Sequence, residues 1–131
     1  MYMLDTNICI YLLKTHSKKL RQKFRVHREL CISVMTWAEL CYGVENSASS
    51  QREPRRRQLR EFARRLLVLP LEDSAGPFYG RIRAQLRRDG ALIGANDLLI
   101  AAHAMATDCT LVSNNLREFR RIDGLVVENW A

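Results

Sequence analysis

The chain has 131 residues, of which 47% are apolar, so it is long enough to form one domain with a single hydrophobic core over residues 1–131. Its 21 Lys and Arg residues against 14 Asp and Glu residues give a net charge of +7, which favours a polyanionic partner but leaves RNA, DNA and an acidic protein open. The N-terminus lacks the basic region of a secretory signal, and the longest later apolar run, LLIAAHAMA, is too short to span a bilayer. We therefore expect a cytoplasmic protein with no membrane segment.

Short apolar runs rich in β-forming residues alternate with stretches of helical periodicity along the chain. This alternation is typical of βαβ units and a parallel sheet. We therefore expect an α/β fold with a parallel four- to five-stranded sheet flanked by helices. The candidate strands are YML (residues 2–4), LCISV (30–34), LLVLP (66–70), CTLVS (109–113) and LVVEN (125–129).

The first candidate strand ends at Asp5, which is followed at once by Thr6 and Asn7. All three residue types cap helices, so one explanation is simply a helix that begins here. The alternative is a functional site, because open parallel sheets place their ligands at the carboxyl ends of the strands. Position alone leaves both explanations open for Asp5.

Glu39 lies in the segment SVMTWAELCYGVE, where apolar residues surround it. The preceding strand should end near Ser33, and the following helix repeats apolar side chains at Met35, Leu40 and Val44. Glu39 falls at the margin of that buried face, where a carboxylate is costly unless a cation or hydrogen bonds compensate for its burial. A plain surface glutamate is the alternative.

Two basic blocks, residues 14–28 and 52–65, hold seven Lys or Arg residues each. The segment NSASSQREP (46–54), which overlaps the second block, is predicted to be a loop. After it, apolar residues at helical spacing from Leu59 to Leu66 indicate a helix with one buried stripe. Three arginines spaced four residues apart stack along the other side and are candidates for binding a phosphate backbone, although a solvated helix face is the alternative. They are Arg56, Arg60 and Arg64.

Towards the C-terminus, a helix with apolar residues at Tyr79, Ile82 and Leu86 is expected to end at Gly90. In the next segment, IGANDLLIAAHAMA, Asp97 falls in the first turn of a helix that is apolar on most sides. A favourable interaction with the helix dipole would explain an acid there. The N-terminus of a buried helix also points towards the ligand edge of the sheet, and another polar cluster, Ser113, Asn114 and Asn115, follows the fourth candidate strand.

The cysteines and histidines do not form a metal-ligand pattern. The four cysteines are widely spaced with no CxxC pair, which predicts reduced core residues rather than disulfides or a zinc site. The three histidines are scattered, and His103 is interpreted as a packed or surface-tipped imidazole inside an apolar helix. The residues concerned are Cys9, Cys31, Cys41, Cys109, His16, His27 and His103.

Asp5, Glu39 and Asp97 resemble the acidic triad of the PIN-domain nucleases, and more narrowly that of the VapC toxins of bacterial toxin–antitoxin modules. The resemblance runs the whole length of the chain through MLDTN, ISVMTWAEL, IGANDLLIAAHA, LVSNNLREFRRIDGL and the terminal Trp130. No single segment is specific, but five in the expected order are. The resemblance implies a compact PIN-like α/β fold, endoribonuclease activity that depends on Mg²⁺ or Mn²⁺, a homodimer and inhibition by a VapB antitoxin.

With this resemblance, the chemistry of phosphodiester hydrolysis assigns roles to the polar residues. A hard divalent cation activates water and stabilises negative charge, and Mg²⁺ keeps several waters, so two or three carboxylates suffice. Asp5 and Asp97 are predicted as the main metal ligands, with Glu39 completing the catalytic cluster. Many PIN domains have a fourth acid where this chain has Asn115, so the number of metal ions stays open. The polar residues predicted to surround the acids are Asn7, Thr36, Ser113 and Asn115.

The resemblance is nearer to family members that cleave initiator tRNA, and so inhibit translation, than to those that cleave ribosomal RNA. Two alternatives come from other classes of protein. A phosphotransferase of the haloacid dehalogenase type also begins with a strand and an Asp, but its motif needs an acid where this chain has Asn7. A non-catalytic nucleic-acid-binding module would rely on the arginine blocks alone.

Overall fold

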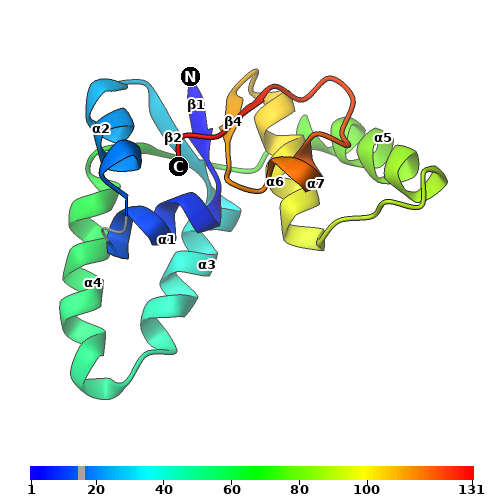
Figure 1. Ribbon diagram of the computed structural model, residues 1–131. Coiled ribbons are helices and arrows are strands. Elements are labelled where there is room, and N and C mark those ends of the chain that lie inside the picture. Colours follow the sequence, from blue (N-terminus) through cyan, green and yellow to red (C-terminus); the bar gives the residue numbers. More distant parts are fainter. Residues whose placement is uncertain (15–16) are drawn as a thin grey trace.

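The predicted strands all form, and they assemble into one parallel sheet with the order β3-β2-β1-β4-β5 (Figure 1). The computed structural model describes residues 1–14 and 17–131, so His16 lies outside the described residues. The central strand is β1, in which Met3 pairs with Cys31 on one side and with Leu111 on the other. The strands are β1 (Tyr2–Leu4), β2 (Leu30–Ser33), β3 (Leu67–Leu69), β4 (Thr110–Val112) and β5 (Val127–Glu128).

Helices connect the strands and cover both faces of the sheet (Figure 1). Successive side chains of a strand point to opposite faces, so Met3 and Leu4 enter two different core clusters. Met3 packs with residues of α5, α6 and α7, and Leu4 packs with residues of α1 to α4. The described helices are α1 (Thr6–Lys14), α2 (Lys18–Val26), α3 (Val34–Glu45), α4 (Ser49–Ala63), α5 (Ala75–Arg88), α6 (Ala95–Ala106) and α7 (Leu116–Phe119).

The predicted loop over residues 46–54 is wrong beyond Ala48, because α4 begins at Ser49 and contains Pro54. Proline removes the amide proton that would bond to the Ser50 carbonyl, which usually breaks a helix. Here both residues are exposed, so water can bond to the Ser50 carbonyl in the first turn of the helix. The predicted end of α5 is confirmed, since Gly90 follows the helix with a φ of 64°.

The burial of each strand depends on its position in the sheet. β3 lies at an edge, and Leu67 there is 56% exposed, whereas β1, β2 and β4 carry the buried core.

All four cysteines are free, as predicted, although Cys41 is only half-buried. Trp130 is buried against Tyr2, with ring centroids 5.1 Å apart. No helix in residues 1–14 and 17–131 is long and apolar enough to cross a membrane.

Candidate active site

The three predicted acids line one open pocket of about 490 Å³ at the carboxyl edge of the sheet. Asp5 directly follows β1, Glu39 is carried by α3, and Asp97 lies in the first turn of α6. Thr6 and Asn7 also line the pocket. Residues 92 positions apart in the sequence are therefore brought to one place by the topology of the parallel sheet.

Asp5 is both a helix cap and a pocket residue, so the two explanations left open by the sequence are compatible. It is 3% exposed, and its Oδ1 accepts a hydrogen bond of 2.9 Å from the Ile8 N–H in the first turn of α1. The pKa of Asp5 is raised to about 6, mainly by burial; hydrogen bonds from Ser113 and Ile8 oppose this increase, and the nearby Asp97 and Glu39 contribute to it. The carboxyl group thus sits where its charge is costly unless a cation compensates it.

Glu39 is held in place by a hydroxyl group that the sequence did not single out. Thr6 donates a hydrogen bond of 3.0 Å to Glu39 Oε1, and its oxygen also lies 3.3 Å from Thr36 Oγ1. Thr36 is fully buried one turn before Glu39 on α3, close to the acids as predicted. The sequence showed Thr6 only as a possible cap, because the hydrogen bond depends on how α1 packs against α3.

Asp97 is half-buried near the N-terminus of α6. Burial is the main cause that raises its pKa, followed by repulsion from Glu118 and then from Glu39. Glu118, on α7, is therefore a further acid close to this site, and it was missed in the sequence. The available signal was its position in SNNLREF, three residues after Asn115 and so one helical turn away.

The four residues predicted to surround the acids occupy different positions. Ser113 is buried at the end of β4, hydrogen-bonds to Asp5 and accepts the Asn115 backbone N–H at 2.9 Å. Asn115 itself is half-buried at the start of α7 and does not line the acid pocket. Asn7 is exposed and lines the pocket, whereas Thr36 is buried behind Glu39.

The predicted nucleic-acid-binding arginines lie on α4, away from the acid pocket. Each is in an ion pair with a carboxylate: Arg56 with Glu45 at 2.8 Å and with Glu53 at 2.6 Å, Arg60 with Glu53 at 3.7 Å, and Arg64 with Glu61 at 2.7 Å. No Lys or Arg among the described residues lines the acid pocket. Binding of nucleic acid by this arginine row stays a prediction.

The donors at the acid pocket have the chemistry that a hard cation requires. Carboxylate, hydroxyl and amide oxygens are the ligands that Mg²⁺ prefers. Within residues 1–14 and 17–131, no three Asp, Glu, His or Cys side chains already converge on a single point. Mg²⁺ is usually bound by one or two carboxylates and several waters, so acids that line a pocket without meeting fit this ion.

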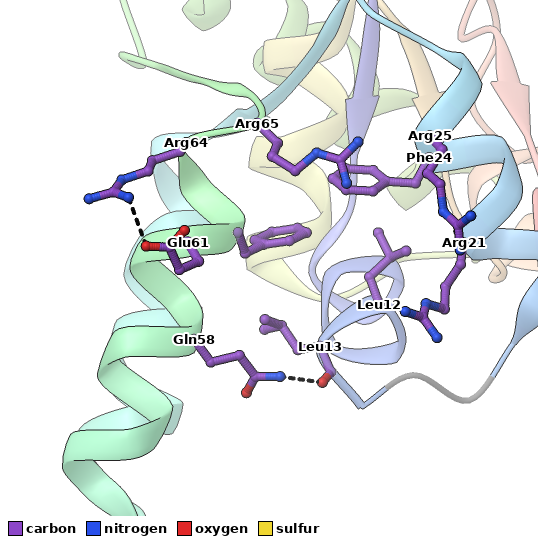
Figure 2. Close-up of a pocket in the computed structure, with 10 residues that line it drawn as sticks. Leu12, Leu13, Arg21, Phe24, Arg25, Gln58, Glu61, Arg64 and Arg65 are labelled. Carbon is purple, nitrogen blue, oxygen red and sulfur yellow. Dashed lines mark hydrogen bonds and ion pairs between the residues drawn. The ribbon is translucent and has the colours of Figure 1, made fainter.

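A second concave surface lies beside the first helices (Figure 2). A pocket of about 400 Å³ between α1, α2 and α4 combines apolar walls with cations such as Arg21, Arg25 and Arg65. The Arg65 guanidinium lies 4.5 Å from the centre of the Phe24 ring. A third pocket, of about 330 Å³, shares Leu13 and Gln58 with this one and shares Ile10 and Glu39 with the acid pocket. The three pockets thus form a continuous path along α1.

The fold and the acid pocket correspond to a known class of protein. The family model described as "PIN domain" matches residues 2–125, so the chain belongs to the PIN-domain family. It is 41% identical to "Ribonuclease VapC2" of Rickettsia felis over 98% of this chain and 97% of the relative. It is 39% identical to "tRNA(fMet)-specific endonuclease VapC" of Shigella flexneri over 99% and 98% of the two chains. Within the PIN domains, the chain is thus a member of the VapC ribonucleases.

Solved structures agree with this assignment. The chain superposes on a structure described as VapBC2 from Rickettsia felis bound to a DNA fragment from their promoter, with a TM-score of 0.93 and 39% identity. That match covers 99% of this chain and 98% of the other. A DNA-bound VapBC from Salmonella typhimurium gives a TM-score of 0.92 at 40% identity and the same coverage. The family membership excludes the haloacid dehalogenase alternative.

Proposed function

We propose that this chain is the ribonuclease toxin of a toxin–antitoxin module and that it cleaves RNA with Mg²⁺, for which Mn²⁺ substitutes. The observation that carries the proposal is the placement of Asp5, Glu39 and Asp97 around one pocket that no described cation lines. Uncompensated carboxylates of this kind favour a divalent metal over a structural ion pair. When bound, such an ion activates a water molecule and stabilises the charge that develops on the phosphate.

The protein's own residues prepare the pocket for this reaction. Asp5 and Asp97 would hold the ion, directly or through water, and Thr6 donates a hydrogen bond to the Glu39 carboxylate, which lines the pocket. Glu39 is the residue placed to orient the attacking water. Since water is the nucleophile, the RNA 2′-hydroxyl is not needed, and the product should carry a 5′-phosphate.

We propose initiator tRNA as the substrate, because the Shigella flexneri relative is named for that activity. Its cleavage would inhibit translation and would take place in the cytoplasm. The decisive experiment sequences the RNA 5′ ends that appear after brief expression in cells, with the Asp5→Ala variant as the control. A single site in initiator tRNA is the expected result. New ends that also appear with the variant would contradict the proposal.

We propose a VapB-type antitoxin as the protein partner, seated on the three connected pockets along α1. The apolar walls at Leu13 and Leu40 would receive its side chains, and Glu39, where this path joins the acid pocket, would receive a basic residue from it. Such a segment would compete with both metal and RNA. Truncating the C-terminal segment of the antitoxin encoded beside this protein should abolish inhibition of RNA cleavage. Unchanged inhibition would count against this arrangement.

We also propose that the toxin is a homodimer, as the family resemblance implies. Light scattering of the purified chain, without its antitoxin, should give twice the monomer mass of 15.2 kDa. A monomer mass at micromolar concentration would contradict this part of the proposal.

A further inference from the structure

His103 is a buried polar residue for which the proposed reaction has no role. It lies in α6, is 1% exposed, and its Nδ1 is 2.8 Å from Ser33 Oγ. Ser33 is also fully buried, and the two residues are 70 positions apart. A buried hydrogen bond between two such distant segments fixes their relative position strongly, because leaving either group without a partner is costly.

The Ser33 hydroxyl connects this contact to α3. Ser33 is the N-cap of α3, and its Oγ accepts the Met35 backbone N–H at 3.1 Å. The hydroxyl proton therefore remains free to be donated to Nδ1 of a neutral His103 ring, which places the ring proton on Nε2. Burial lowers the pKa of His103, which agrees with a neutral ring. On the opposite side of the ring, Nε2 is buried without a hydrogen-bond partner among the described residues, and this side faces the end of β3 near Pro70.

The His103–Ser33 hydrogen bond is separated from two of the acids by the same number of residues. Asp97 is six residues before His103 on α6, and Glu39 is six residues after Ser33 at the start of α3. Six helical residues span about 9 Å, so the hydrogen bond lies less than two turns from each carboxylate. Each helix is rigid over this length, so the His103–Ser33 contact directly affects the distance between Asp97 and Glu39.

We propose that His103 is a positioning residue of the nuclease, which holds α6 against the N-cap of α3 and so sets the separation of Asp97 and Glu39. It acts through Ser33 and touches neither RNA nor the bound ion. The inference rests on the proposed function for its effect on cleavage. The hydrogen bond and its effect on α3 can be tested without RNA.

The test compares four variants of the full chain. His103→Leu removes the hydrogen bond while filling the buried space, and His103→Asn keeps a polar group at the place of Nδ1. Ser33→Ala removes the hydroxyl. Thr107→Val is the matched control, because the Thr107 hydroxyl, at the C-cap of α6, donates a bond of 2.8 Å to the His103 carbonyl and has no hydrogen bond to α3 among the described residues.

For RNA cleavage, we expect His103→Leu to lower kcat about 10- to 100-fold, the range typical when a residue that supports a metal site is removed. The KM for RNA should change less than about twofold, since binding of the strand is unaffected. His103→Asn should recover most of the rate, and Thr107→Val should keep it. The double variant with Ser33→Ala and His103→Leu should be no slower than the slower single variant.

Amide hydrogen exchange at Met35 provides the readout that needs no activity. We expect faster exchange of this amide in His103→Leu than in wild type and no change in Thr107→Val. If His103→Leu retains full kcat, or if the kcat of all four variants simply follows the melting temperature, the proposal is wrong. If wild type fails to cleave RNA, the proposed function fails, while Met35 exchange still decides whether His103 holds α3. Should His103→Leu not fold, a lower kcat in Ser33→Ala together with a retained kcat in His103→Asn supports the proposal, and full kcat in Ser33→Ala overturns it.

Discussion

The acid pocket and helix α4 both concentrate charged residues, yet they handle charge in opposite ways. In the pocket, Asp5 and Asp97 are buried or half-buried with like charges around them, and the pKa of each is raised. On α4, arginines form exposed ion pairs with nearby glutamates, including Glu45 at the end of α3, and the pKa of Glu45 is lowered by its bond to Arg56. Exposed ion pairs that form within the protein add little to its stability. Carboxylates without a cation partner indicate a binding site for a ligand.

The largest effect that would test this contrast is expected for Asp97→Asn. If Asp97 binds the metal as proposed, this variant should lower RNA cleavage more than about 100-fold, beyond the loss typical of residues that only support a metal site. Without metal, the variant should be as stable as wild type or more so, because repulsion with Glu118 and Glu39 is relieved. An RNA cleavage assay measures the first effect. Thermal melts in chelator and in Mg²⁺, with the exposed Asp89→Asn as control, measure the second. A clearly lower melting temperature in chelator would show that Asp97 is a structural residue.

The next effect concerns the pH dependence of stability and depends on Asp5. Its pKa rises from 3.8 to about 6 on folding, so between these values the native state binds more protons than the unfolded state. Stability without metal should therefore fall as the pH rises from 4 to 6, by about 3 kcal/mol in total. Asp5→Asn removes this loss and keeps an oxygen for the Ile8 N–H. In chelator, the melting temperature of Asp5→Asn should be higher than that of wild type at pH 7.5 and equal to it at pH 4. The same difference in melting temperature at both pH values would refute the explanation.

A smaller effect is expected at Thr6, which orients Glu39 through a hydrogen bond of 3.0 Å. Thr6→Val keeps the shape of the side chain but loses that bond, so kcat should fall about tenfold, at the lower end for residues that support a metal site. Thr6→Ser retains the hydroxyl and is the matched control. Equal rates for the two variants in single-turnover cleavage would show that the hydroxyl does not orient Glu39.

The smallest effect is expected on α4. Arg56→Ala should leave the melting temperature almost unchanged, because its ion pairs with Glu45 and Glu53 are exposed to solvent. If this row of arginines binds RNA, the slope of log affinity against log salt should fall by about 1. Arg57→Ala, exposed on the same helix, is the comparison. A large drop in melting temperature for Arg56→Ala alone would mean that the α4 network contributes to stability after all.

The strands could be predicted from the sequence because each depends on local pattern, whereas local pattern left each of the three acids open and the resemblance to the PIN-domain family grouped them. An apolar run such as YML followed by a polar residue indicates both a buried strand and the sheet edge that Asp5 occupies. The helical start at Ser49 could not be predicted in this way. Pro54 normally interrupts a helix, and only the exposure of this part of α4 makes it acceptable.

The residues that support the acids were harder to predict, because their roles depend on packing between distant helices. Thr6 and Thr36 meet only when α1 lies against α3, and Glu118 approaches Asp97 only when α7 lies beside α6. His103 looked like an ordinary core residue, since its hydrogen bond to Ser33 joins positions 70 residues apart. Periodicity reports which face of a helix is buried but not what that face contacts.

The two-sided core has a consequence for when the protein becomes active. Glu39 comes from a helix on the side of the sheet covered by α1 to α4, and Asp97 comes from α6 on the other side, with Asp5 directly after the central strand between them. During synthesis, Asp5 and Glu39 are made well before Asp97, and β4, which pairs with the central strand β1, is made after α6. A nascent chain therefore carries no assembled site. The toxin becomes able to cut RNA only once the ribosome that makes it has nearly finished.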